Sequence, residues 1–340
     1  MKVAGLIMSK RKLRLTGLER LASQNRHADL RFVEFEVESI SGQDLLDQKL
    51  DAIVQKIPAI VSPAETQKGG IAAPFMEFLE ANKGVVCIDP PKFIRPLLDR
   101  SSQFNLMRDC LRRSDLSDRV CVPNFCNLHS NDTDANFERM REVHMRFPII
   151  CKPSSAHGIE TAHKMALVFN KEGLTQIDYP CLAQQFVNHG GKLFKLFVVG
   201  TKTFTQKRSS IANLSQLSTR PPVFFDSKKV SKNDCTTFDA ENIGHGDVEL
   251  GAEVVADEPL FHRIATVLRE SIHLDLFGLD LIACLEDDPS ESHGSPSYRW
   301  GIIDLNIFPD YIGIPNFPEY LENLVRQKLS LPLLDIPEKK

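Results

Sequence analysis

Strand-like and helix-like segments alternate through the first 110 residues, and this alternation constrains the fold more than any other feature of the chain. Residues 32–38 place Val33, Phe35 and Val37 between glutamates, which is the period of a half-buried strand. Further strand-like stretches cover residues 3–8, 51–57 and 85–88, and helical spacing covers residues 15–26, 73–82 and 91–110. The alternation predicts an open α/β lobe built on a parallel sheet.

The rest of the chain follows a different pattern. Short strand-like segments lie close together at residues 147–152, 166–169, 181–187, 193–200 and 202–208, with one short helix at 171–177. Helical segments at 260–273 and 316–329 then flank strand-like segments at 276–284 and 300–307, which a polar loop joins. We predict an α/β protein, α+β in its middle and C-terminal lobes. Its expected parts are an N-terminal lobe (1–110), a central lobe (111–200), a C-terminal lobe (201–330) and a frayed tail (331–340).

Composition excludes several classes of protein. The chain has 340 residues, 42% of them hydrophobic, so it can bury a core and is neither disordered nor fibrous. Its 41 basic and 45 acidic residues give a net charge of −4, which argues against a nucleic-acid or membrane coat. The eight cysteines are scattered, without a Cys-x-x-Cys pair. We expect a cytoplasmic monomer with reduced cysteines, no signal peptide, no membrane span, and no nucleic-acid or membrane partner.

Several common catalytic motifs are missing from the sequence. It contains no Gly-x4-Gly-Lys-[Ser/Thr], no Gly-x-Gly-x-x-Gly after a strand, no His-Arg-Asp or Asp-Phe-Gly, and no Gly-x-Ser-x-Gly. P-loop enzymes, simple dinucleotide oxidoreductases, protein kinases and α/β-hydrolases are therefore disfavoured.

Two apolar strand-like segments near the C-terminus carry isolated polar residues. Asp304 and Asn306 are two apart within residues 300–307, so both side chains project from one face. Asp280 lies alone within residues 276–284, and a hairpin would bring it beside Asp304. Each residue alone could merely cap a strand or bind the backbone. Together, these oxygen donors in apolar surroundings predict a Mg²⁺ site that takes its other ligands from water and phosphates.

Two lysines interrupt apolar strands upstream of these carboxylates. Lys152 ends residues 147–152, and Lys195 lies within residues 193–200. Such a lysine either snorkels to the strand edge or faces an anion, and the two together indicate phosphates clamped between ammonium groups and Mg²⁺. The small polar loop at 154–163, with His157 and Gly158, could cradle phosphates through its backbone N–H groups or be an ordinary hairpin loop. The apolar strand at 181–187 could hold an adenine ring.

A set of strings in a fixed order carries a family resemblance over about residues 2–330. The strings are Ile88-Asp-Pro-Pro, Cys151-Lys152, His163-Lys-Met165, Gln185-Phe-Val-Asn-His189, Leu276-Phe-Gly-Leu-Asp280 and Ile303-Asp304-Leu-Asn306-Ile-Phe-Pro-Asp-Tyr311. They resemble the ATP-grasp enzymes and, more narrowly, the inositol 1,3,4-trisphosphate 5/6-kinase (inositol tetrakisphosphate 1-kinase) family. The resemblance implies an ATP-grasp fold and transfer of the ATP γ-phosphate to a hydroxyl of a soluble inositol phosphate, with Mg²⁺ as cofactor.

The resemblance also implies a role for individual residues. Those expected to bind ATP are Arg100, Lys152, His157, Gly158, Gln184, Gln185, Phe186, Val187, Ser210, Ser227 and Ser231. Those expected to bind the substrate are Lys12, Lys56, His163, His189, Lys195, Asn306 and Asp310. Lys152 and Asp304 are the expected catalytic residues, and Asp280, Asp304 and Asn306 the expected Mg²⁺ ligands.

The N-terminal basic residues agree with a polyphosphate substrate. Lys12 belongs to a basic run after the first strand-like segment, and Lys56 lies near the end of another, both at the usual ligand edge of an α/β sheet. One position departs from the family pattern, because Asp310 stands where a glycine beside the substrate is expected. A carboxylate there opposes a polyanion. We expect Asp310 to weaken substrate binding and narrow the accepted isomers, unless it turns away or pairs with a cation such as Lys195.

Two other functions share parts of this pattern. An ATP-grasp carboxylate–amine ligase would use the same nucleotide half, but the basic residues Lys12 and Lys56 favour a phosphorylated substrate. A non-catalytic inositol-phosphate binding protein would be consistent with Asp310, but the intact set of Asp280, Asp304 and Asn306 argues against it. The sequence leaves open the isomer and hydroxyl that are used.

Overall fold

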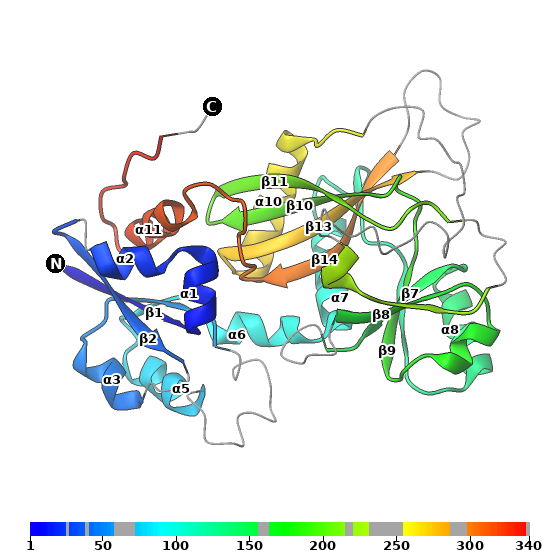
Figure 1. Ribbon diagram of the computed structural model, residues 1–340, viewed down its shortest axis with the longest axis horizontal. Helices are drawn as coiled ribbons and strands as arrows, with labels where there is room; N and C mark the ends of the chain where they lie inside the picture. Colours follow the sequence, from blue (N-terminus) through cyan, green and yellow to red (C-terminus); the bar gives the residue numbers. More distant parts are fainter. Residues whose placement is uncertain are drawn as a thin grey trace.

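A computed structural model provides the structure of the chain. It describes residues 1–24, 27–37, 41–57, 72–155, 163–214, 220–230, 254–285 and 298–337. Three sheets succeed one another along the long axis of the molecule (Figure 1). The N-terminal sheet lies at one end, a second sheet containing β10 and β13 lies in the middle, and a third containing β7–β9 lies at the other end.

The N-terminal lobe is a parallel sheet of strand order β2-β1-β3-β4. Its strands are β1 (Lys2–Met8), β2 (Leu30–Glu36), β3 (Ala52–Gln55) and β4 (Val86–Ile88), and its helices are α1 (Lys10–Thr16), α2 (Glu19–Gln24), α3 (Gly42–Asp47) and α5 (Ala72–Ala81). Alternate residues of β1 point to opposite faces, so Ile7 packs in one core while Leu6 and Met8 join another. The predicted parallel α/β lobe is confirmed.

Two helices expected to be continuous are each divided, and both predictions of a single helix were wrong. The helix expected at 15–26 is split into α1 and α2 because Gly17 has φ +69°, a left-handed conformation that ends α1. The helix expected at 91–110 is split into α6 (Pro91–Ile94), a 3₁₀ turn (Arg95–Leu98) and α7 (Arg100–Arg112). Asp99 is extended, and its side chain accepts a hydrogen bond from the N–H of Ser102, which makes it the N-cap of α7. This break makes Arg100 the first residue of α7.

The third sheet is antiparallel, with strand order β12-β8-β7-β9-β6. Its strands are β6 (Phe125–Leu128), β7 (Ile149–Pro153), β8 (Lys164–Val168), β9 (Cys181–Gln185) and β12 (Val223–Asp226). Helix α8 (Thr133–Glu142) and the 3₁₀ turn Glu172–Gln176 pack beside it (Figure 1). Their apolar side chains form a core with one face of the sheet, so its other face remains for the site.

The middle sheet has strand order β11-β10-β13-β14-β5. Its strands are β5 (Val120–Cys121), β10 (Lys192–Val199), β11 (Lys202–Ser209), β13 (Leu276–Leu285) and β14 (Tyr298–Ile307); α9 (Ser227–Val230), α10 (Glu258–Ile272) and α11 (Phe317–Lys328) complete the fold. Helix α10 packs against the sheet, and the largest core runs from here into the N-terminal lobe. The predicted boundary at 110 falls within α7, although all strands of the N-terminal sheet precede it, and the boundary at 200 does not divide the other two sheets. Strands β5 and β10 precede residue 200 yet belong to the middle sheet, while β12 follows it yet belongs to the third.

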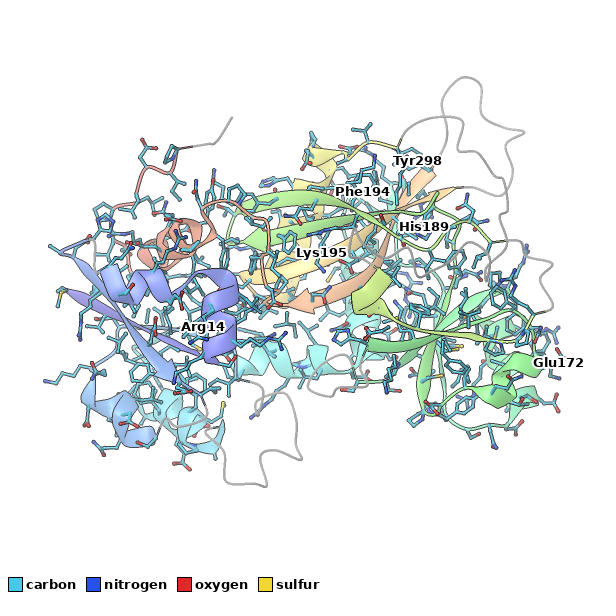
Figure 2. The ribbon with its side chains drawn as sticks, viewed as in Figure 1. Arg14, Glu172, His189, Phe194, Lys195 and Tyr298 are labelled. Atoms are coloured by element: carbon cyan, nitrogen blue, oxygen red, sulfur yellow. The ribbon has the colours of Figure 1, made fainter. Side chains whose placement is uncertain are left out.

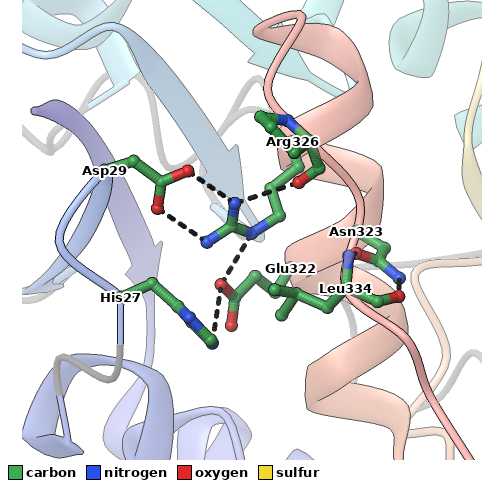
Figure 3. Close-up of polar contacts among 7 residues, drawn as sticks. His27, Asp29, Glu322, Asn323, Arg326 and Leu334 are labelled. Carbon is green, nitrogen blue, oxygen red and sulfur yellow. Dashed lines mark hydrogen bonds and ion pairs between the residues drawn. The ribbon is translucent and has the colours of Figure 1, made fainter.

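Helix α11 joins the C-terminal segment to the N-terminal lobe through the buried Arg326 (Figure 3). Its guanidinium donates to both carboxylate oxygens of Asp29, at 2.8 and 2.9 Å, and to Glu322 Oε1 at 2.9 Å. It also donates to the carbonyl of Pro332, and Asn323 exchanges two hydrogen bonds with the backbone of Leu334. The prediction of fraying from residue 331 was therefore wrong for residues 331–337, because these contacts hold that segment on α11.

Two further observations concern the whole described part of the chain. Seven of the cysteines are free thiols, and Cys235 lies outside the described residues. Among the helices in the described ranges, none is both long enough and apolar enough to span a membrane.

Candidate active site

An open cleft of about 990 Å³ lies between the middle and third sheets. One wall comes from β7, β8 and β9 and the other from β10, β13 and β14. Apolar side chains that line it include Ile150, Met165, Leu193, Ile282 and Ile303. Sequence reasoning did not identify these five residues, because each is one member of an ordinary apolar strand and only the facing of two sheets brings them together.

The carboxylates predicted to bind Mg²⁺ meet at one end of this cleft. Asp280 and Asp304 are paired in the antiparallel register of β13 and β14, as predicted, and Asn306 lies two residues further along β14. One oxygen of Asp280 is buried without a hydrogen bond, and the ammonium of Lys195 lies 3.4 Å from it. Burial raises the pKa of Asp280, and Asp304 adds to the increase, while Lys195 opposes it.

These donors fit a magnesium ion by their chemistry. Two carboxylates and an amide oxygen form a hard, oxygen-only set, and Mg²⁺ would satisfy the oxygen of Asp280 that the protein leaves without a hydrogen bond. A cation would also favour the charged form of Asp280, which burial disfavours.

Lys152 links the two walls of the cleft. Its ammonium donates to Gln184 Oε1 on β9 at 2.7 Å and to the carbonyl of Ile303 on β14 at 2.8 Å. The side chain is 3% exposed, and burial lowers its pKa to about 8. Lys152 therefore lies beside the carboxylate pair and connects the two sheets there through these hydrogen bonds.

Arg100 contacts Asp304 directly. Its Nη1 is 2.9 Å from Asp304 Oδ1, and its Nε donates to the carbonyl of Pro153 at 3.0 Å. The resemblance implied a contact with ATP phosphates, so the ion pair with Asp304 is a contact that sequence reasoning missed. Because the helix break at Asp99 makes Arg100 the first residue of α7, its guanidinium extends from the start of that helix to Asp304 on β14.

The residues expected to hold the nucleotide line the same cleft in part. Gln184, Gln185, Phe186 and Val187 border it at the end of β9, with Ser210 and Ser227 nearby. Three more of the expected ATP contacts, at His157, Gly158 and Ser231, lie outside the described residues.

The two expected histidines differ in their surroundings. His189 is buried, with Nδ1 2.7 Å from the carbonyl of Val187 and Nε2 2.8 Å from Ser210 Oγ. Burial lowers its pKa, and its two ring contacts hold the segment between β9 and β10 to Ser210. His163 borders the cleft with Nδ1 3.4 Å from Ser227 Oγ. Figure 2 shows His189 and Lys195 in the central region of the molecule, with Arg14 on α1 in the neighbouring lobe.

Lys12, Lys56 and Asp310 form a separate group where the N-terminal lobe meets the end of β14, and none of them lines the cleft. Lys12 donates to Asp310 Oδ1 at 2.8 Å, so the partner of Asp310 is Lys12 rather than Lys195. Lys56 donates to the carbonyl of Ile307 at 2.5 Å, and burial, with the charge of Lys12, lowers its pKa to about 7. Burial likewise lowers the pKa of Lys12 despite Asp310.

Comparisons with known proteins agree on one family. A profile described as the inositol 1,3,4-trisphosphate 5/6-kinase ATP-grasp domain matches residues 114–327. Inositol-tetrakisphosphate 1-kinase of Xenopus laevis is 30% identical over 336 residues, covering 97% of this chain and 80% of that protein. The enzyme of the same name from Danio rerio is 29% identical over 324 residues, covering 93% and 76%.

Solved structures are similar in fold at low sequence identity. N5-carboxyaminoimidazole ribonucleotide synthetase from Thermotoga maritima gives a TM-score of 0.53 at 13% identity, covering 98% of this chain and 77% of that one. D-alanine–D-alanine ligase from Bacillus anthracis gives 0.52 at 11% identity, covering 97% of each chain. At such identities the likeness shows the fold alone.

Proposed function

Because the chain belongs to the inositol 1,3,4-trisphosphate 5/6-kinase family of ATP-grasp proteins, we propose that its cleft binds ATP and Mg²⁺ and directs the γ-phosphate to an inositol phosphate hydroxyl. The chain is an inositol phosphate kinase with the ATP-grasp fold. We assign this chemistry to particular residues of the cleft.

The observation that carries this assignment is the charge arrangement at one end of the cleft. The carboxylates of Asp280 and Asp304 lie beside two buried cations, Arg100 and Lys152. Asp280 is also 3.4 Å from a third cation, Lys195. An anion bound by lysines alone would not need the carboxylates. A nucleotide triphosphate that arrives with a dication uses both signs of charge.

The apolar part of the cleft suits the nucleotide base. Val187 and Phe186 follow the end of β9 at the cleft, and Ile150 and Ile303 face it from opposite sheets. An apolar region of a cleft between two sheets, close to the end of a strand, favours an adenine ring with its phosphates toward Lys152.

Asp280, Asp304 and Asn306 would hold Mg²⁺, which supplies charge neutralisation on the terminal phosphates of ATP. Arg100 holds the carboxylate of Asp304 in one orientation. Lys152, which donates to the carbonyl of Ile303 on the same strand, places its charge where the phosphates of ATP would lie. Phosphoryl transfer needs positioning and electrostatic stabilisation more than proton abstraction, so these fixed charges account for the chemistry without a dedicated general base.

Lys195 stands at the border between nucleotide and substrate. It pairs in register with Asp280 across β10 and β13, and it lines the cleft together with Asn306. This position suits an ammonium that contacts the phosphate of an inositol phosphate next to the transferred group.

Transfer of ³²P from γ-labelled ATP to a panel of inositol phosphates, with and without Mg²⁺, tests the proposal. The parent should label at least one member and only with Mg²⁺, and Asp280→Asn should lose most of this transfer. Asp134→Asn removes an exposed carboxylate that pairs with Lys171 and serves as the matched control. ADP release that requires an amine and a carboxylate, without labelled inositol phosphate, would instead identify a ligase.

A further inference from the structure

The group formed by Lys12, Lys56 and Asp310 follows the cleft along the chain. Asn306 is the last residue of β14 that lines the cleft, and the acceptors for the two lysines begin at the next residue, Ile307. The group therefore lies at the end of the cleft that faces the N-terminal lobe, just past the proposed Mg²⁺ ligand.

The hydrogen bonds of Lys12 are fully used within the chain. An ammonium has three N–H donors. Lys12 donates to the carbonyl of Phe308 at 2.9 Å, to that of Pro309 at 2.7 Å and to Asp310 Oδ1 at 2.8 Å. Its side chain is only 8% exposed, and the ring of Phe308 covers it at 4.6 Å. A substrate phosphate could bind Lys12 only by displacing one of these acceptors.

Asp310 is the displaceable one, and it is also the group that faces solvent. Its side chain is 48% exposed, whereas the two carbonyls belong to the backbone that follows β14. Burial alone would raise the pKa of Asp310, but the charges of Lys12, Lys56 and Arg11 hold this pKa below its ordinary value. Asp310 is therefore a carboxylate. The side chain that faces solvent here is thus an anion, although Lys12 and Lys56 lie beneath it and the exposed Arg11 is close enough to act on its charge.

We propose that Asp310 takes the place of a substrate phosphate at Lys12 and thereby selects inositol phosphates that carry no phosphate at the position nearest this lysine. The inference rests on the proposed function, since it assumes that the inositol phosphate binds between Lys195 and the N-terminal lobe.

Selection follows from the charges. A phosphate brought to this position meets a carboxylate and must either displace it or remain beside it, and both cost binding free energy. A hydroxyl at the same position carries no charge and can donate a hydrogen bond to the carboxylate. Specificity is the difference between these two affinities, so a single carboxylate can exclude a whole class of isomers.

Titration calorimetry without ATP tests the inference separately from catalysis. The ligands are pairs of inositol phosphates that differ by one phosphate, and the proteins are the parent, Asp310→Asn, Asp310→Glu and the control Asp134→Asn. We expect Asp310→Asn to bind the more phosphorylated member of at least one pair about tenfold more tightly, with a change under about twofold for its partner. Asp310→Glu keeps the charge and should keep the parental ratio, as should Asp134→Asn.

Equal changes for both members of every pair, or no change, would overturn the inference. A parent that binds ATP but no inositol phosphate would refute the proposed function as well, whereas a parent that transfers phosphate while Asp310→Asn keeps its ligand ratios would refute the selectivity role alone. Thermal melting is measured for each variant. If Asp310→Asn melts early, Asp310→Gly replaces it in the same titrations and is held to the same criterion.

Discussion

Replacing Lys152 by methionine should nearly abolish phosphoryl transfer while leaving the protein folded. Methionine keeps most of the length of the side chain and its packing near the ring of Phe104, which lies 5.3 Å from the ammonium. What it removes is the positive charge between the two walls of the cleft. Loss of one fixed charge or donor at a developing phosphoryl charge costs about 2.7–4 kcal/mol by analogy with oxyanion donors, or about 100- to 1,000-fold in kcat.

The effect on stability is the difference between two opposing contributions. Burial lowers the pKa of Lys152 from 10.5 to about 8, so its charge at neutral pH costs about 3 kcal/mol, which methionine relieves. Against this, Gln184 Oε1 and the carbonyl of Ile303 lose their donor, at about 1–3 kcal/mol each. The free energy of unfolding should therefore fall by no more than about 3 kcal/mol, which a core of this size tolerates.

Steady-state kinetics with saturating ATP and Mg²⁺, together with urea unfolding, measure both effects. Lys171→Met is the matched control, because Lys171 is an exposed lysine near the same sheet that pairs with Asp134. A Lys152→Met variant that is folded and retains kcat within about fivefold of the parent would refute the role assigned to this lysine, since the predicted loss is far larger.

Three further predictions test other parts of the structure. Asp304→Asn should lower kcat about 100-fold or more at any Mg²⁺ concentration, as seen in a metal titration of the rate, because a carboxylate that Arg100 orients becomes neutral. Burial lowers the pKa of Lys56 from 10.5 to about 7, so between these pH values the unfolded chain binds more protons than the folded one. The contribution of Lys56 should therefore make the stability measured in urea rise with pH, and Lys56→Met should flatten that rise. Arg326→Met should cost about 3–5 kcal/mol in urea unfolding, because Glu322 stays buried without its partner, whereas Asp29→Asn should cost much less because the side chain of Asp29 is exposed to solvent. A small loss for Arg326→Met would mean that α11 does not depend on this ion pair.

Local geometry made part of the site predictable from the amino-acid sequence. Side chains two apart in a strand share a face, so the spacing of Asp304 and Asn306 alone places them together on β14. The pairing of Asp280 with Asp304 follows from two neighbouring apolar segments, and the position of Lys152 on β7 follows from one. The parallel N-terminal lobe was predictable for a similar reason, because alternation of strands and helices in the chain leaves little choice of topology.

Contacts between distant groups depend instead on how the lobes pack. Arg100 and Asp304 are 204 residues apart, and Lys12 and Asp310 are 298 apart, so no spacing in the sequence could have paired them. The breaks at Gly17 and Asp99 depend on one backbone conformation each, which weighs little in a helical pattern of a dozen residues. The predicted boundary at residue 200 failed because strands from both sides of it pair within the same sheets. The pairing of strands is set by the assembled core and not by their order in the chain. Burial lowers the pKa of Lys12 and Lys56, and the three N–H donors of Lys12 are all used within the chain. Both effects arise only when the lobes have packed together.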